Sequence, residues 1–171
     1  KHLDATKTFP ETKLLAEGMK AKKQNRMLKL GLGDLPVKVK SHYDYNQFKL
    51  SPDGSKIAYV TNELGQYKIW LYDFETRKLK KIFKREYKLA RITDRSFPIL
   101  TWHPTGEMLA FTFEKKGRAY IGNYTIYTKK KREKELFRID KVIDFQFSED
   151  GRKMIFSGVA GGKSDLYLYQ V

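Results

Sequence analysis

The fold of this chain is decided by one stretch of sequence, FKLSPDGSKIAYV at residues 48–60. Apolar residues alternate with polar ones before and after its centre, which is the periodicity of strands with one buried face. At the centre, Pro52 fixes φ, Asp53 can hydrogen-bond to its own backbone, and Gly54 can adopt a positive φ. The stretch therefore predicts two antiparallel strands joined by a tight turn.

The same pattern occurs twice more, as LTWHPTGEMLAFT at residues 100–112 and FQFSEDGRKMIFS at residues 145–157. The central glycines are 52 and then 45 residues apart. Each copy is followed by a polar or glycine-containing turn and a third strand, and the first copy also by a fourth strand near residues 79–83. Four strands in 45–50 residues is the size of one propeller blade. The residues assigned to the repeat turns are Ser51, Pro52, Asp53, Gly54, Pro104, Gly106, Asp150 and Gly151.

The first copy, with Ile-Trp-Leu-Tyr-Asp at residues 69–73, resembles the TolB-type, WD-repeat-like β-propeller repeat. The second copy has His103 for Ser and Thr105 for Asp, and the third has Glu149 for Pro. The resemblance covers about residues 46–171. It implies either a periplasmic propeller of the TolB kind or a propeller attached to a larger envelope protein or to a peptidase. The expected location is the periplasm or the outer membrane of a Gram-negative bacterium.

We therefore predict an all-β chain, a partial β-propeller of about three four-stranded blades, with a helical extension at residues 1–40. The blades are assigned to residues 41–90, 91–138 and 139–171, and the last is incomplete. An open propeller exposes two blade flanks. We expect either that the chain is a fragment of a longer propeller, which its first residue Lys1 also suggests, or that a second copy completes the ring.

The extension is expected to begin at Thr8, a possible helix cap, and to be helical from Thr12 to Leu30. We expect one helix, or two short ones broken near Gln24-Asn25. Gly31-Leu32-Gly33 and Pro36 supply a stop. Its basic residues either lie on a solvated face or bind anionic lipid or nucleic acid; they are Lys20, Lys22, Lys23, Arg26 and Lys29.

The composition excludes several classes of protein. The 171 residues contain no cysteine, so disulfides and cysteine-ligated metal sites are impossible. No apolar run is long enough for a transmembrane helix. The glycines of residues 157–164 have the wrong spacing for a phosphate-binding loop, and the three histidines are scattered. We predict no catalytic residue, cofactor or metal site in this chain.

The charge is the strongest compositional signal, with 35 Lys and Arg against 20 Asp and Glu. Much of it lies at residues 77–91 and 129–141, which map to outer strands and blade connections. Lysine on an edge strand blocks sheet-to-sheet association, so these residues are interpreted as solvated edges.

Blade topology places the loops before each first strand on the same side as the turns between second and third strands. That side is basic with interleaved aromatic residues and is a candidate partner-binding surface. The alternative is that its aromatic residues pack between blades. The candidate residues are Tyr43, Tyr45, Arg95, Phe97, Lys115, Lys116, Arg118 and Lys163.

Three functions remain open. The first is a non-catalytic scaffold that binds protein partners of the cell envelope. The second is an accessory propeller that gates substrate for a peptidase domain outside this chain. The third, nucleic-acid binding, ranks last because the basic residues lie on separate segments rather than along one groove.

Overall fold

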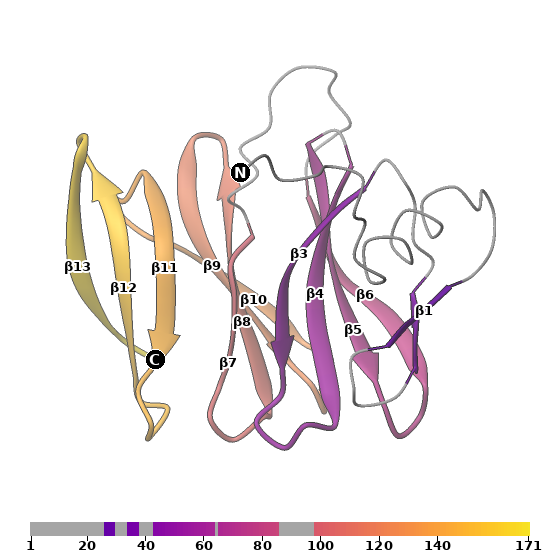
Figure 1. The fold of residues 1–171 in the computed structure, drawn as a ribbon. Coiled ribbons are helices and arrows are strands. Elements are labelled where there is room, and N and C mark those ends of the chain that lie inside the picture. Colours follow the sequence, from indigo (N-terminus) through magenta and orange to yellow (C-terminus); the bar gives the residue numbers. More distant parts are fainter. Residues whose placement is uncertain (1–25, 30–33, 38–42, 64, 86–97) are drawn as a thin grey trace, which may run out of the picture. The chain divides into compact units, whose positions relative to one another are not determined.

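The computed structural model describes residues 26–29, 34–37, 43–63, 65–85 and 98–171, the first two ranges by their backbone alone. The chain divides into two compact units, Lys1–Tyr43 and Asp44–Val171, and each is described by itself. The described residues contain strands and turns and no helix (Figure 1).

In the first unit, β1 (Arg26–Lys29) pairs antiparallel with β2 (Asp34–Val37). The predicted helix is therefore wrong at residues 26–29, while its other residues, 12–25 and 30, lie outside the described part. Helix propensity is a weak preference, and pairing with a neighbouring strand overrides it for these four residues.

The second unit contains three antiparallel sheets that follow one another along the chain. The first consists of β3 (Asp44–Leu50), β4 (Lys56–Glu63), β5 (Gln66–Asp73) and β6 (Lys78–Arg85). The second consists of β7 (Leu100–Trp102), β8 (Met108–Lys115), β9 (Arg118–Thr125) and β10 (Lys131–Glu135). The third consists of β11 (Lys141–Phe147), β12 (Lys153–Ala160) and β13 (Lys163–Gln170). We call them blades 1, 2 and 3, and the prediction of a partial propeller whose last blade has three strands is confirmed.

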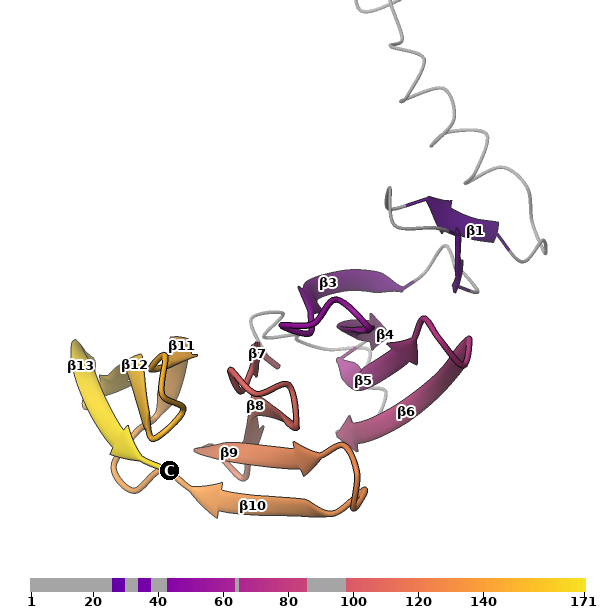
Figure 2. The same cartoon turned by 90° about the horizontal axis from the view of Figure 1, so that it is seen from below.

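Within each blade the strands pair in the order in which they occur in the sequence. The first strands lie next to one another, because β7 contacts both β3 and β11, and β6 and β10 form the outer edges (Figure 2). Two sets of turns therefore lie at opposite ends of the strands (Figure 1). We call residues 51–55, 103–107 and 148–152 the lower edge, and residues 65–66, 115–118 and 160–163 the upper edge.

The core of this unit lies between the blades. One cluster of buried side chains joins blades 1 and 2, and it includes Val60, Ile69, Phe83, Phe111 and Phe113. A second cluster joins blades 2 and 3 and includes Ala110, Ile121, Leu136, Met154 and Phe156. β8 is buried at consecutive positions instead of showing an alternating pattern, which agrees with a blade that packs on a neighbour at each face. β4 of blade 1 is also buried at consecutive positions.

Close packing also explains one glycine in the middle of a strand. A Cβ atom on Gly122 would collide with the ring of Phe111 on the neighbouring strand β8. A glycine inside a strand commonly marks such a close approach.

The described part of the chain contains no helix long and apolar enough to cross a membrane.

Candidate interaction surfaces

The lower-edge turn of blade 1 is built by Ser51 and Asp53. The backbone N–H of Gly54 donates to the carbonyl oxygen of Ser51 at 2.9 Å, and Gly54 has φ of 71°. The hydroxyl of Ser51 donates to the Asp53 carboxylate at 2.5 Å and accepts from the backbone N–H of Lys56 at 2.9 Å. Hydrogen bonds from Ser51 and Ser55 lower the pKa of the Asp53 carboxyl to about 2.

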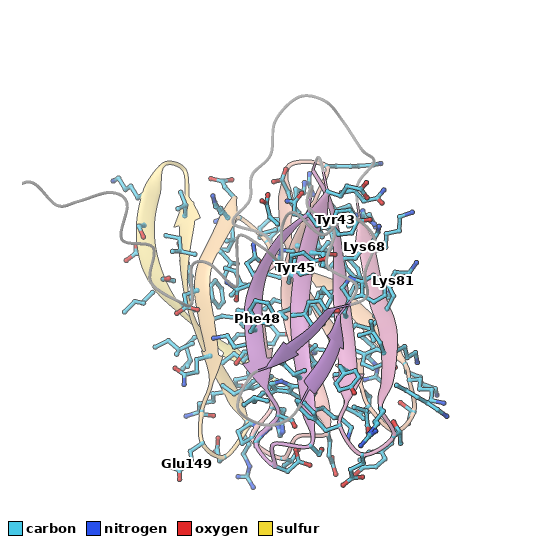
Figure 3. The ribbon with its side chains drawn as sticks, turned by 45° about the vertical axis from the view of Figure 1, so that its right-hand side comes forward. Tyr43, Tyr45, Phe48, Lys68, Lys81 and Glu149 are labelled. Atoms are coloured by element: carbon cyan, nitrogen blue, oxygen red, sulfur yellow. The ribbon has the colours of Figure 1, made fainter. Side chains whose placement is uncertain are left out.

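Blade 3 repeats this arrangement with Ser148 and Asp150, whose carboxylate accepts from Ser148 Oγ at 2.5 Å and from the N–H of Arg152 at 3.0 Å. These hydrogen bonds, chiefly the one from Ser148, lower the pKa of Asp150. The position occupied by proline in the other two turns is Glu149, which Figure 3 shows at the tip of the lower edge.

Blade 2 makes the same turn with different chemistry. The ring atom Nδ1 of His103 takes the place of the serine hydroxyl, and it lies 2.8 Å from Oγ1 of Thr105 and 3.3 Å from the Thr105 backbone N–H. Because that N–H donates to Nδ1, the ring hydrogen lies on Nε2, which faces the carbonyl oxygen of Gly151 at 3.2 Å. His103 thus closes its own turn and also links the lower edges of blades 2 and 3.

The upper edge presents two tight hairpin tips. Lys116 and Gly117 have φ of 56° and 71°, and Gly161 and Gly162 have φ of 55° and 78°. Two consecutive residues with positive φ are the signature of a type I′ hairpin turn, which matches the twist of the flanking strands. Lys116 and Lys163 are exposed at these two tips.

Arg118, at the start of β9, forms an ion pair with Glu135 on β10. The guanidinium Nη1 lies 2.7 Å from Glu135 Oε1, and the hydroxyl of Tyr120 donates to Oε2 at 2.9 Å. The hydrogen bond from Arg118 lowers the pKa of Glu135, and the carboxylate in turn raises the pKa of Tyr120. Lys115 Nζ lies over the Tyr120 ring, 5.5 Å from its centre. These contacts leave Lys116 and Lys163 as the candidate lysines outside this cluster.

The structure gives different outcomes for the aromatic residues predicted to bind a partner. Tyr45 lies on β3, and its ring stacks on Tyr59 of β4 with the centroids 6.4 Å apart, so it packs within blade 1. Figure 3 shows Tyr45 with Phe48 along this strand. Tyr43 belongs to the first unit, and Arg95 and Phe97 lie outside the described residues.

Basic residues of the outer strands form contacts that the sequence analysis missed. Lys80 on β6 donates to the hydroxyl of Tyr124 in blade 2 at 2.8 Å. Lys131 on β10 lies 4.8 Å from the centre of the Phe83 ring in blade 1, and Lys134 lies 4.8 Å from that of Tyr169 in blade 3. A cation over an aromatic ring is attractive, so these lysines link neighbouring blades.

Among residues 43–63, 65–85 and 98–171, no group of three His, Cys, Asp or Glu residues is placed to hold a metal ion.

The sequence of this chain resembles that of a known protein over part of its length. No protein-family model matches the sequence. A protein of Sulfurisphaera tokodaii described as a Tricorn-like protease C-terminal subunit is 39% identical over 67 residues, which is 39% of this chain and 7% of that protein.

Solved structures resemble much more of the chain. TolB from Acinetobacter baumannii matches with a TM-score of 0.60 and 23% identity, over 81% of this chain and 34% of TolB. The β-propeller domain of the Trilobed protease from Pyrococcus furiosus matches with a TM-score of 0.56 and 16% identity, over 75% of this chain and 39% of that domain. A prolyl endopeptidase matches with a TM-score of 0.60 and 14% identity, over 81% of this chain and 22% of the enzyme. The chain thus spans about a third of the length of TolB, and its blades have the fold of a partial β-propeller of the kind found in TolB and in these peptidases.

Proposed function

We propose that this chain is a non-catalytic segment of a larger β-propeller protein and acts as a scaffold that binds a protein partner through its upper edge. The observation that carries the proposal is the pair of hairpin tips in blades 2 and 3. They present Lys116 and Lys163, both exposed, at the same edge of adjacent blades that a buried core joins. Exposed basic side chains on a rigid support suit a partner with an acidic surface.

A charge-reversal experiment tests this surface. The variant Lys116→Glu/Lys163→Glu and the unchanged chain are used to capture partners from a nuclease-treated extract of the source cells. We expect the partner retained by the unchanged chain to be lost with the variant, because like charges across an interface repel.

Lys129 provides a matched control. It is an exposed lysine with φ of 56°, like Lys116, but it lies in the β9–β10 connection, at the opposite end of β9 from Lys116. Lys129→Glu should capture the partner as well as the unchanged chain does. Equal capture by all three proteins, or equal loss with Lys129→Glu, would contradict the assignment of the upper edge.

The match to a Tricorn-like protease subunit supports a second candidate, the accessory propeller of a peptidase. In that case the captured partner, identified by mass spectrometry, should be a subunit with peptidase activity. A partner without peptidase activity would favour the scaffold function.

The two kinds of similar protein support different cellular compartments for this chain. The resemblance to TolB supports the envelope of a Gram-negative bacterium, whereas the Sulfurisphaera tokodaii relative comes from an archaeon. Fractionation of the source cells decides between them: recovery in the periplasmic fraction supports the envelope, and recovery in the cytosol contradicts it.

A further inference from the structure

One exposed aromatic side chain lies on a tight turn between blades 2 and 3. Phe137 is 75% exposed and belongs to the connection from β10 to β11. The backbone N–H of Ile139 donates to the carbonyl oxygen of Leu136 at 3.2 Å, and the third residue of the turn, Arg138, has φ of 64°, as in a type II turn. Leu136 and Ile139 are buried in the cluster between blades 2 and 3, so the two ends anchor the turn while its two middle side chains are exposed. We call residues 136–139 the Phe137 turn.

The Phe137 turn lies on the same side of the blades as the upper edge. β10 pairs antiparallel with β9 and ends beside the start of β9, next to the β8–β9 tip. The N–H of Leu136 donates to the carbonyl oxygen of Ala119 on β9 at 2.9 Å. On the other side, the N–H of Gly161 in the β12–β13 tip donates to the carboxylate of Asp140, one residue after the turn, at 2.8 Å. These hydrogen bonds fix the turn between the two hairpin tips that carry exposed lysines.

The exposed surface around the Phe137 ring is basic. Arg138 lies beside the ring, with its guanidinium carbon 5.3 Å from the ring centre. In residues 115–118, 136–140 and 160–163, the exposed charged residues are Lys116, Arg118, Arg138, Asp140 and Lys163. Arg118 is paired with Glu135, and the single acidic member of the set accepts a hydrogen bond from the neighbouring tip. The other three are basic, so this surface attracts carboxylates around an exposed apolar ring.

We infer that the upper edge binds an acidic protein segment that presents an apolar side chain among its carboxylates, and that this side chain packs on Phe137. The inference rests on the proposed function and specifies the chemistry of the partner. The carboxylates face Lys116 and Lys163, and the apolar side chain removes the exposed ring from water. An aromatic residue on a rigid support, surrounded by polar groups, is typical of the residues that contribute most to binding. The turn and both tips belong to blades 2 and 3, so the surface requires no other blade.

The test uses two synthetic peptides as probes for such a segment. In the first, one phenylalanine is flanked on each side by aspartates, and in the second, serine replaces the phenylalanine. Each peptide is added to the nitrogen-15-labelled chain, and its dissociation constant is obtained from the shifts of amide NMR signals. We expect the first peptide to bind about tenfold more tightly than the second. The shifting signals should belong to residues 115–118, 136–140 and 160–163.

Phe137→Ala should remove the preference for the first peptide, because the phenylalanine of the peptide loses the ring on which it packs. Binding of the serine peptide should stay unchanged. Tyr127→Ala is the matched control, since Tyr127 is a 78% exposed aromatic residue in the β9–β10 connection, at the opposite end of β9. This variant should keep the full preference. Both side chains are exposed, so the remaining NMR signals of the folded chain should stay in place.

The variant Lys116→Glu/Lys163→Glu separates this inference from the proposed function. It should lose both peptides, and unchanged binding would contradict the proposed function itself. If it loses both peptides while Phe137→Ala keeps the preference of the unchanged chain, the basic tips bind the partner and the role inferred for Phe137 is wrong. Equal affinity of the unchanged chain for the two peptides, no binding of either peptide, or signal shifts remote from the Phe137 turn would also overturn the inference.

Discussion

At the scale of single residues, three turns share one set of backbone hydrogen bonds although their side chains differ. Ser51 with Asp53 and Ser148 with Asp150 use a hydroxyl and a carboxylate, whereas His103 with Thr105 uses an imidazole and a hydroxyl. In each turn the first side chain contacts a short polar side chain two residues later, and an oxygen of that second side chain accepts a backbone N–H two residues further on. Blade 2 has a larger first side chain, which also reaches the neighbouring blade.

Asp53 makes the stability of blade 1 dependent on pH in a predictable direction. Its pKa is about 2 in the folded chain, below the ordinary 3.8, because Ser51 and Ser55 donate to the carboxylate. The ionised form therefore stabilises the fold above about pH 4, and this contribution is lost as the pH falls through the interval from 4 to 2. The difference in free energy of unfolding between the unchanged chain and Asp53→Asn, measured with urea, should shrink as the pH falls from 6 to 2. Glu149→Gln removes a carboxylate from the blade 3 turn and is the control for losing a charge at the lower edge. If the difference in unfolding free energy between the unchanged chain and Asp53→Asn does not change with pH, the role assigned to the Asp53 carboxylate is wrong.

Gly54 and Gly151 separate two reasons for a turn glycine. Both have a positive φ, but a Cβ on Gly54 would meet open space, whereas one on Gly151 would collide with the ring of His103. We expect Gly54→Ala to cost about 1–2 kcal/mol of unfolding free energy through its backbone conformation alone. Gly151→Ala should lower the unfolding free energy by ~1–3 kcal/mol more than Gly54→Ala does, because His103 is displaced and its hydrogen bond is lost. Urea denaturation measures both.

A double-mutant cycle gives the control for this comparison. The additional cost of Gly151→Ala should disappear in a chain that also carries His103→Ala, since the ring that causes the collision is gone. Equal costs for Gly54→Ala and Gly151→Ala in the unchanged background would show that His103 does not link the two blades.

At the scale of elements, the outer strands have two roles. β6 carries Lys78, Lys81 and Lys84 on an exposed edge, in agreement with the interpretation that lysine protects a sheet edge. The same strand contributes Phe83 to the core, where its ring lies 4.7 Å from that of Phe111 and 4.9 Å from that of Phe113. An outer strand is therefore also part of the interface with the next blade.

This role gives a prediction for the stability of the blade pair. Phe83→Ala should lower the free energy of unfolding by about 3–5 kcal/mol, because it removes a buried ring and leaves a cavity between blades 1 and 2. Leu79→Ala, on the same strand but exposed, should change it by less than about 1 kcal/mol. Similar effects of the two substitutions in urea denaturation would contradict the placement of β6.

At the scale of the whole molecule, the sequence analysis succeeded where local chemistry determines structure. Pro52, Asp53 and Gly54 specify a turn within a few residues, and repetition of that pattern indicated successive blades. Contacts between blades were not accessible in this way. Nothing local pairs Lys80 with Tyr124, which are 44 positions apart, and stacking of Tyr45 on Tyr59 depends on the register of two strands. The strand at Arg26–Lys29 was missed because a pairing partner, and not the residues themselves, decides its conformation.

The net charge of +15 also gains a structural interpretation at this scale. Part of it lies on exposed edges, part is held over aromatic rings of the neighbouring blade, and part is paired, as Arg118 is with Glu135. The lysines at the hairpin tips are the part that we assign to a partner.

The account rests on consecutive blades that pack face to face, and Trp102 offers the most direct test. Its indole N–H donates to the carbonyl oxygen of Lys49 in blade 1 at 2.9 Å, across 53 positions of the sequence. The chain has two tryptophans, so two indole N–H signals are expected in a nitrogen-15 correlated NMR spectrum. Nuclear Overhauser effects should connect one of them to protons of Lys49 and Leu50. If contacts within each blade are observed and these contacts between blades are absent, the packing described here is wrong.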